Sequence, residues 1–199
     1  MPYTIKNDPY INRQTGIFRN LLGIDQKLAL ENAEAQITSV EISALLIDNS
    51  SVVVDFDSNL LCKIHKKLFS EIYDWAGKYR TIDMEKDNTR FAHTPHIISQ
   101  LKQLLSELSD ENCLVGLNKN DFSDRLAHYY SELNIIHPFR EGNGRTIRTF
   151  MSLLAANANW DIAWDIMDSK ENIISCISGY TGNEKPLYEM LNKIISRKD

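Results

Sequence analysis

The chain has 199 residues, of which 43% are hydrophobic, so it is long enough to form one compact domain with a buried core. Its formal net charge is −5 and its pI is about 5.6, and no block of Lys and Arg interrupts this acidic balance. These values argue against a nucleic-acid-binding surface and favour protein or nucleotide partners.

The N-terminal half is expected to be an irregular arm followed by two helices and a hairpin. Residues 1–25 are polar and contain Pro and Gly, which predicts an arm without regular structure. Residues from 25 to about 46 and from 59 to about 75 have apolar positions at helical spacing, and Gly77 closes the second helix. Between 78 and 93, residues with strand propensity precede an Asp-Asn turn, which predicts a short β-hairpin and the only strands of the chain.

The C-terminal half is expected to be helical. Apolar periodicity predicts helices over residues 97–108, 121–136, about 169–178 and about 185–196, with a loop at 109–118. Asp121 or Asn120 can cap the second of these helices. Helices joined by short loops, with one short hairpin, predict an all-α fold class in a single domain over residues 1–199.

Residues 137–146 (HPFREGNGRT) carry the densest chemistry of the chain. The proline after His137 disfavours helical backbone at the residue before it, so a helix should end there and leave the imidazole at an exposed corner. Gly142 and Gly144 allow backbone N–H groups to approach a ligand closely. Apolar residues recur at helical spacing from Ile147 onward, so a second helix should begin at this loop and point its free N–H groups into it.

Charged side chains complete this loop. Arg145 and Arg148 are three residues apart on one helical face, and arginine pairs with phosphate oxygens in bidentate fashion. Glu141 offers a carboxylate of the kind that holds Mg²⁺ beside a polyphosphate. The imidazole of His137, with a reference pKa of ~6.5, can accept a hydroxyl proton. Together these residues indicate nucleotidyl or phosphoryl transfer.

The stretch from His137 to Arg148 resembles the signature of the Fic family, His-Pro-Phe-x-[Asp/Glu]-Gly-Asn-Gly-Arg-x-x-Arg, at every position. Other segments are similar to the short bacterial cell-filamentation Fic proteins. They are Asp8-Pro9-Tyr10, Phe18-Arg19-Asn20, Leu22-Gly23-Ile24 and Gly182-Asn183 with Pro186-Leu187. The family's flap region is resembled by Trp75-Ala76-Gly77-Lys78-Tyr79-Arg80 and Phe91-Ala92. The resemblance therefore covers most of the chain.

The resemblance implies a mainly helical Fic fold, with the flap at about 78–93 and the catalytic loop and helix start at 137–148. It also implies a protein adenylyltransferase that transfers AMP from ATP to a Ser, Thr or Tyr hydroxyl of a target protein. His137 is then the general base, and Glu141 holds the Mg²⁺ that bridges the α- and β-phosphates. The ATP-binding residues implied are Gly142, Asn143, Gly144, Arg145 and Arg148.

Two further expectations follow from the resemblance. The ring of Phe139 should point into the core and fix the loop. The flap residues Thr81, Ile82 and Asp83 should dock the backbone of the target through the edge of a strand, which requires no particular target sequence.

The family's inhibitory motif, [Ser/Thr]-x-x-x-Glu-[Gly/Asn], has no full copy in this chain. The nearest segment, Thr81-x-x-x-Glu85, is followed by Lys86 and lies in the expected flap. The chain therefore resembles toxin components that are controlled by a separate small antitoxin protein, with the docking surface expected near the N-terminal helices. Such proteins modify DNA topoisomerase subunits, which are the targets that the resemblance suggests.

A cytoplasmic location is expected from the cysteines and the N-terminus. Cys62, Cys113 and Cys176 are odd in number and lack metal-ligand spacing, so a disulfide framework is not expected. The N-terminus lacks a signal-peptide pattern, and no apolar run approaches the ~20 residues that span a membrane.

Two other functions remain open from the sequence. A Fic-fold transferase could move another phosphate-containing moiety, because the base and the anion cradle do not decide which group departs. A non-catalytic nucleotide-binding or protein-interaction module could keep the fold without turnover. Outside these functions, Arg140 occupies the variable motif position and is interpreted as solvated, and His65 and His128 are interpreted as structural or surface residues.

Overall fold

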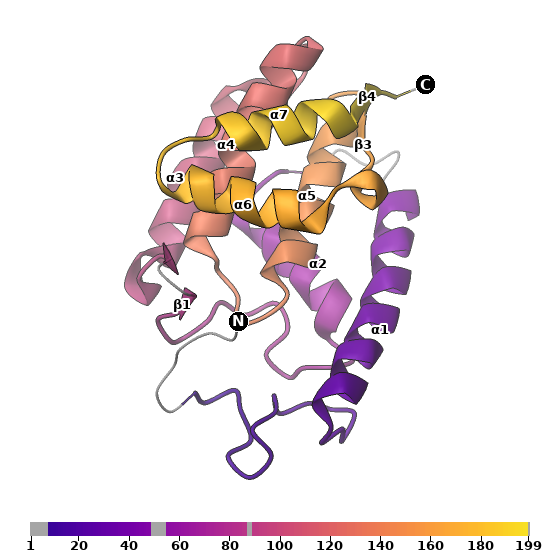
Figure 1. Cartoon of the computed structure of the whole chain (residues 1–199), viewed down its shortest axis with the longest axis vertical. Coiled ribbons are helices and arrows are strands. Elements are labelled where there is room, and N and C mark those ends of the chain that lie inside the picture. The colour runs from indigo at the N-terminus through magenta and orange to yellow at the C-terminus, as the bar shows by residue number, and fades with distance from the viewer. Residues whose placement is uncertain (1–7, 49–54, 87–88, 199) are drawn as a thin grey trace.

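A computed structural model describes residues 8–48, 55–86 and 89–198. Seven α-helices lie within these ranges (Figure 1): α1 (Lys27–Asp48), α2 (Ser58–Phe69), α3 (Ile97–Asp110), α4 (Lys119–Ile136), α5 (Asn143–Asn157), α6 (Ser169–Tyr180) and α7 (Lys185–Ile194). Short 3₁₀ turns occur at Thr94–His96, Asn112–Leu114 and Trp164–Ile166. The predicted helical fold class is confirmed.

Side-chain caps set the first residues of three helices. The carboxylate of Asp57 accepts a hydrogen bond from the backbone N–H of Leu60 at the start of α2, and Asp168 caps α6 in the same way. Asn118, rather than Asn120 or Asp121, caps α4, because its side-chain oxygen accepts from both of their N–H groups. The predicted cap of α4 is therefore wrong by two or three residues.

The second predicted helix is too long, because α2 ends at Phe69 and not near residue 75. Residues 70–77 form turns instead, and the chain then leaves through Gly77, whose φ of +78° favours glycine. The apolar residues that continue the helical spacing beyond Phe69 still enter the core, since Ile72, Tyr73 and Trp75 are buried. Periodicity therefore identified buried residues but not the end of the helix.

The flap hairpin is shorter than predicted and lies further along the chain. Strands β1 (Glu85–Lys86) and β2 (Thr89–Arg90) pair in antiparallel register, and the predicted Asp87-Asn88 turn lies outside the described residues. Tyr79, Thr81 and Ile82 have no strand conformation, so the prediction of strand there is wrong.

A second two-stranded sheet was not predicted. Strand β3 (Trp160–Ile162) pairs antiparallel with β4 (Ile195–Arg197), and β4 replaces the last residues of the helix expected to reach 196. Because β3 follows α5 and packs against it, this pairing holds the C-terminal segment near the end of α5.

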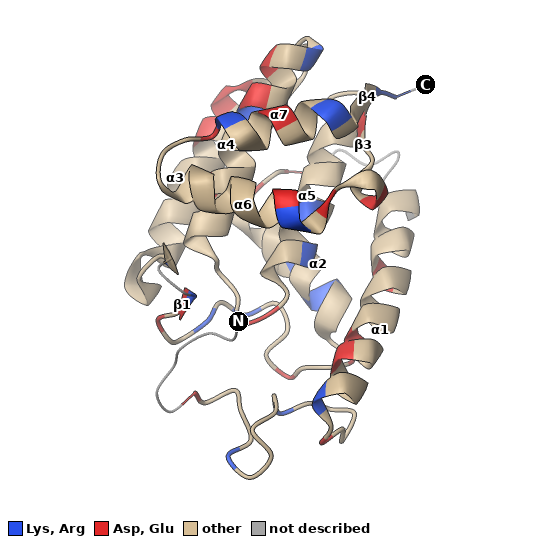
Figure 2. Ribbon diagram, viewed as in Figure 1, with Lys and Arg blue, Asp and Glu red and all other residues tan. Residues whose placement is uncertain are grey.

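The helices pack around one hydrophobic cluster that extends from Tyr10 to Ile195. In Figure 1, α6 and α7 lie side by side and pack against α4, and α1 runs along the right-hand edge of the view, where it packs against α2 and α5. Acidic and basic residues alternate along α7 (Figure 2), as Lys185, Glu189 and Lys193 illustrate. Within the described ranges, no helix is both long enough and apolar enough to cross a membrane.

The N-terminal arm is fixed to the body by specific contacts. Tyr10 is buried and packs edge-on against Trp75, with ring centroids 5.3 Å apart. Ile11 and Phe18 form an isolated antiparallel bridge, and the Leu21 N–H donates to the Ile72 carbonyl at 2.8 Å. Residues 8–25 of the arm are irregular, as predicted, but they are part of the folded structure and reach the candidate site, while residues 1–7 lie outside the described residues.

Candidate active site

Helix α4 ends at the histidine of the motif, as predicted from the proline that follows it. His137 has φ 49° and ψ 61°, and its N–H donates to the carbonyl of Leu133. A left-handed conformation is uncommon for a residue with a side chain, and such strain often accompanies function. The turn directs the next residues back across the end of α4 and toward the start of α5.

The His137 imidazole is half-buried rather than exposed at a corner. The ring of Phe91, just beyond the hairpin, stacks on it with centroids 3.9 Å apart. Nδ1 lies 3.2 Å from the carbonyl oxygen of Asn134, so Nδ1 carries the proton and donates to it. Burial lowers the pKa of His137 to about 3, which keeps the ring neutral near pH 7. The remaining nitrogen, Nε2, is therefore the unprotonated one, and it is the ring atom that can accept a proton.

Asn143 holds the loop in its turn. Its side-chain oxygen accepts from the backbone N–H of Phe139 at 2.9 Å, and its amide nitrogen donates to the carbonyl of Phe139 at 2.7 Å. Asn143 is buried, and the ring of Phe139 is fully buried, as expected from the sequence. In this conformation the Asn143 side chain shapes the loop from inside, whereas its predicted contact with phosphate stays a prediction.

Gly142 is required by both its backbone and its surroundings. Its φ is +79°, and a Cβ at this position would lie 2.3 Å from Cζ of Phe69. Gly144 differs, because its φ is not in the left-handed region and the nearest atom to a Cβ there is the flexible end of Arg148, at 3.2 Å. The first glycine therefore lets the loop approach α2, and the second lies in the first turn of α5.

His65 of α2 contacts the loop and helps to fix it. The sequence predicted only a structural or surface role for this residue and did not predict these contacts. Its Nε2 lies 3.0 Å from the carbonyl oxygen of Glu141, and its Nδ1 accepts from the N–H of Gly77 at 2.8 Å. The ring stacks on Phe139 at 4.0 Å. Because Nδ1 accepts, Nε2 must carry the proton, and burial lowers the pKa of His65 to about 4. Neutral His65 thus joins α2, the turn at Gly77 and the loop.

The first motif arginine is held by α1. Nη2 of Arg145 lies 2.5 Å from Oε2 of Glu34, and the guanidinium lies over the ring of Phe69 at 4.8 Å. The buried Glu34 also accepts a hydrogen bond from the hydroxyl of Tyr73. The Arg145 side chain is 24% exposed, so part of it remains accessible. Glu34 was not identified from the sequence, because nothing local marks one glutamate of a long helix as a partner of a distant arginine.

The two motif arginines have different neighbours although they share a face of α5. Arg148 extends toward α4 and α6, where its charge opposes the rise in the pKa of the Tyr130 hydroxyl that burial causes. Cys176 of α6 is in the same environment, and burial raises the pKa of its thiol. The two side chains therefore leave the same face of α5 toward different helices.

Arg140 is buried, so its interpretation as a solvated residue is wrong. Its Nε and Nη2 donate to Oδ2 of Asp8 at 2.8 and 2.6 Å, and its guanidinium lies 4.7 Å from the centroid of the Phe18 ring. Both partners come from the N-terminal arm, more than 100 positions away in the sequence. This ion pair fastens the arm directly to the loop.

The three predicted flap residues lie before β1 and differ in their surroundings. The Thr81 N–H donates to the hydroxyl of Tyr10 at 3.1 Å, so this amide is already used within the chain. Ile82 is half-buried. The Asp83 carboxylate accepts from the Thr94 N–H at 2.8 Å, which lowers the pKa of Asp83. Their role in docking a target stays a prediction.

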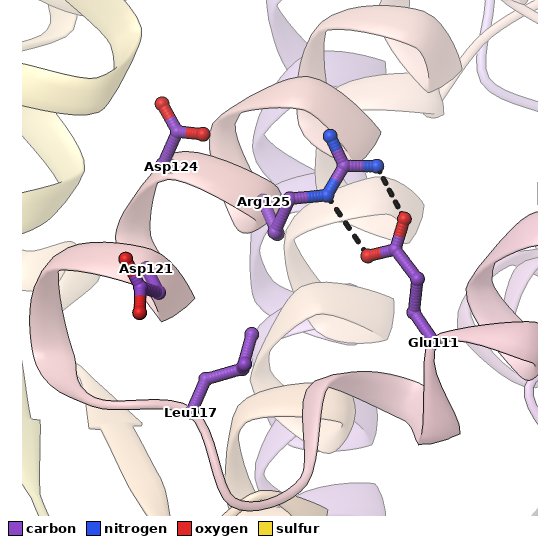
Figure 3. A pocket seen from close by; sticks show the side chains of 5 residues that line it. All are labelled: Glu111, Leu117, Asp121, Asp124 and Arg125. Atoms are coloured by element: carbon purple, nitrogen blue, oxygen red, sulfur yellow. Dashed lines mark hydrogen bonds and ion pairs between the residues drawn. The ribbon is translucent and has the colours of Figure 1, made fainter.

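One pocket of the described structure lies away from the loop. It is lined by Glu111, Leu117, Asp121, Asp124 and Arg125 (Figure 3). Its arginine is already paired with a carboxylate, through Nε–Oε2 and Nη2–Oε1 contacts of 2.8 and 2.6 Å. The excess of carboxylates makes this pocket unsuitable for a polyphosphate.

In the described part of the chain, Glu141 and one separate cluster of side chains have the chemistry to hold a metal. Glu141 is 30% exposed, and its Oε1 accepts from the Gly142 N–H at 2.9 Å and lies 3.8 Å from Nη2 of Arg145. A single accessible carboxylate beside an anion cradle suits Mg²⁺, which is commonly bound by one or two carboxylates together with phosphates. His128, Glu132 and Glu184 form a separate group, in which Nδ1 of His128 pairs with Glu184 at 3.3 Å. Only Glu141 belongs to the loop.

A neutral imidazole, a glycine turn, a helix N-terminus and two arginines meet at one helix–loop–helix corner, and this combination has the chemistry of a phosphate-binding site on a helical fold. The chain belongs to the Fic/DOC family, whose family model matches residues 55–155. Its recognition as a Fic protein from the sequence is confirmed.

Relatives and solved structures extend this likeness. The chain is 40% identical, over 98% of its length, to "Protein adenylyltransferase VbhT" of Bartonella schoenbuchensis, but spans only 40% of that protein. It is 35% identical to "Probable protein adenylyltransferase Fic" of Escherichia coli, covering 95% of this chain and 92% of the relative. The N-terminal Fic domain of a putative cell filamentation protein from Bartonella quintana, solved with bound ADP, has a TM-score of 0.88 at 25% identity, over 96% of this chain and 95% of that one.

Proposed function

We propose that this chain is a protein adenylyltransferase that transfers AMP from ATP to a hydroxyl side chain of a target protein. The observation that carries the proposal is the neutral His137 imidazole at the end of α4, which is protonated on Nδ1 and unprotonated on Nε2. The glycine turn and the start of α5 follow it directly in the chain. Relatives that match nearly the whole chain are named protein adenylyltransferases, in agreement with the activity predicted from the sequence.

His137 acts as the general base in this proposal. Its Nδ1 proton is held by the Asn134 carbonyl, so Nε2 is the atom that takes the proton from the target hydroxyl. The oxygen freed of its proton then attacks the α-phosphorus of ATP, and pyrophosphate leaves. The low pKa of the buried ring means that the base is not lost to protonation between pH 5 and 8.

The start of α5 binds the phosphates. The N–H groups of Gly142 and Gly144 and the positive end of the helix dipole favour anions there. Arg145 and Arg148, three residues apart near the start of α5, neutralise phosphate charge. Bound nucleotides in two Fic-fold neighbours, ADP in the Bartonella quintana domain and AMPPNP in BepC of Bartonella tribocorum, support ATP as the substrate.

Glu141 is the residue proposed to hold Mg²⁺. Its accessible carboxylate is a hard oxygen ligand, and the metal would neutralise charge on the leaving pyrophosphate. His137 and the α5 amides perform their steps on the nucleotide whichever oxygens the metal contacts.

The proposed partners are a target protein and a separate antitoxin. Glu85, the nearest candidate for an internal inhibitory glutamate, lies 3.6 Å from Arg90 within the hairpin, an arrangement that supports control from outside the chain. Exposed apolar residues on α1, Val40 and Ile47, support docking near the N-terminal helices. DNA topoisomerase subunits are the first targets to test, and a cytoplasmic location stays part of the proposal.

Parallel transfer assays with α-³²P-ATP and γ-³²P-ATP test the proposal. The purified chain is incubated with Mg²⁺ and a bacterial lysate, with and without purified topoisomerase subunits, beside a His137→Ala variant. Label from the α-phosphate alone, absent in the variant, supports AMP transfer. Label from the γ-phosphate alone indicates phosphate transfer, and equal labelling by the variant contradicts the role of His137.

A further inference from the structure

Arg80 lies between the flap and the catalytic loop and contacts both. It is 3% exposed, and its side-chain donors point to backbone carbonyls. Nε donates to the His137 carbonyl at 2.8 Å, and Nη2 lies 3.3 Å from the Ile136 carbonyl. On the flap side, Nη1 donates to the backbone carbonyl of Ile82 at 2.8 Å, and Nη2 donates to the backbone carbonyl of Ala92. The Arg80 backbone N–H also donates to the carbonyl of Pro138, the residue after His137, at 2.9 Å.

These acceptors belong to three separate segments. Ile136 and His137 are at the C-terminal end of α4, where carbonyls have no partner within the helix and the dipole favours a cation. Ile82 precedes β1 and Ala92 follows β2, so they are the two stems of the hairpin. A planar guanidinium has five N–H donors in a rigid fork, so it fixes the orientation of all three segments at once.

The stem at Ala92 leads directly to the catalytic imidazole. Ala92 also donates its N–H to the Ile135 carbonyl at 3.1 Å. The preceding residue, Phe91, stacks on the His137 ring at 3.9 Å. A shift of this stem therefore moves the Phe91 ring that covers the His137 imidazole. It also moves the flap backbone that is expected to hold the target.

We propose that Arg80 is a positioning residue, which sets the register between the flap and the His137 imidazole and so determines where a target hydroxyl is presented. This inference rests on the proposed function. The contacts of Arg80 given above run to the flap and to the end of α4. Its loss should therefore impair modification of the target without impairing the binding of ATP.

The test compares Arg80→Lys with the wild-type chain. Lysine retains the positive charge, but its single ammonium group cannot donate to carbonyls of three segments as the planar guanidinium does. We expect kcat/KM for the labelled target to fall ~10- to 100-fold, because small displacements of reacting groups have effects of this size. The Kd of ATP should change less than about twofold, a margin small compared with that effect. Arg125→Lys is the matched control, since it removes another bidentate arginine contact (Figure 3) and should leave both values unchanged. Arg125 lies in the N-terminal half of α4, whereas the loop follows the C-terminal end of that helix.

Hydrogen exchange on the same proteins provides a readout that does not depend on catalysis. In Arg80→Lys the amides of residues 81–92 should exchange faster, whereas those of α5 should keep their wild-type protection. If Arg80→Lys does not fold, Arg80→Gln, which leaves no buried charge, carries the same expectations. Unchanged exchange in the flap, or equal losses of ATP binding and target modification, would overturn the proposal. If the wild-type chain itself transfers no label, the proposed function fails. The hydrogen-exchange measurement then still decides whether Arg80 anchors the flap.

Discussion

Replacing Gly142 by alanine tests how closely the loop approaches α2. Two costs can be worked from the structure. Alanine at a φ of +79° is disfavoured by ~1–2 kcal/mol. The new Cβ also lies 2.3 and 2.4 Å from two atoms of the Phe69 ring, and overpacking of a buried site costs ~1–3 kcal/mol. Restricting the unfolded chain returns ~0.4–1 kcal/mol, so we expect the free energy of unfolding to fall by ~1–5 kcal/mol.

Two other glycines separate these costs. At Gly182, φ is +87° and no atom lies within 4 Å of an added Cβ, so Gly182→Ala reports the backbone cost alone, about 1 kcal/mol. At Gly144, φ is not in the left-handed region, and only the mobile end of Arg148 is close, so Gly144→Ala should stay within about 1 kcal/mol of the wild type.

Urea unfolding followed by circular dichroism gives the three free energies, provided that the m-values agree. A Phe69→Ala background adds a further check, because removal of the ring should reduce the Gly142→Ala effect to the backbone cost. If Gly142→Ala is no more destabilising than Gly182→Ala, the loop does not press against Phe69 as described, and the reasoning is refuted.

Two more predictions concern the supports of the loop. Asp8→Asn should lower the free energy of unfolding, measured by urea titration, by ~3–5 kcal/mol, because it leaves the Arg140 guanidinium buried without its carboxylate. A loss below ~1 kcal/mol would contradict a buried ion pair. His65 has a pKa of about 4 when folded, below its usual value of ~6.5, so the unfolded chain binds a proton that the folded chain does not, and stability falls as the pH drops below ~6.5. Between pH 7 and pH 5 this amounts to about 2 kcal/mol, and His65→Gln should reduce the measured pH dependence by that amount; an unchanged dependence would show that His65 is not neutral and buried.

The local features of the site could be predicted from the sequence. The proline after His137 sets the end of α4, and Gly142 permits the turn that follows it. The apolar residues from Ile147 onward predict a helix that begins at the loop, as α5 does. Each of these features depends on residues within one or two turns of one another, and propensity and periodicity describe such short distances well.

The supports of the site could not be predicted, because their partners are distant in the sequence. Arg140 meets Asp8 across more than 100 residues, and Arg145 likewise meets Glu34 of α1. Periodicity places His65 on the buried face of α2 but does not show that its ring nitrogens join two other segments. Contacts of this kind are decided by packing, so a single sequence carries no local sign of them.

The second sheet and the short α2 were missed for a related reason. Ile194 and Ile195 continue the apolar spacing of α7, yet the backbone becomes extended there because it pairs with β3. A strand of three residues is too short for alternation to distinguish it from the end of a helix. Tertiary pairing overrides local propensity at such positions.

The most direct test of the central claim measures binding and transfer on one pair of proteins, the wild-type chain and His137→Ala. Calorimetry gives the affinity for ATP with Mg²⁺, and α-³²P-ATP gives the rate of labelling of a target. The account predicts that the variant binds ATP as the wild type does and transfers no detectable label. Continued transfer by the variant would contradict the assignment of His137 as the base, and a wild-type chain that binds ATP but labels nothing from it would contradict adenylyl transfer.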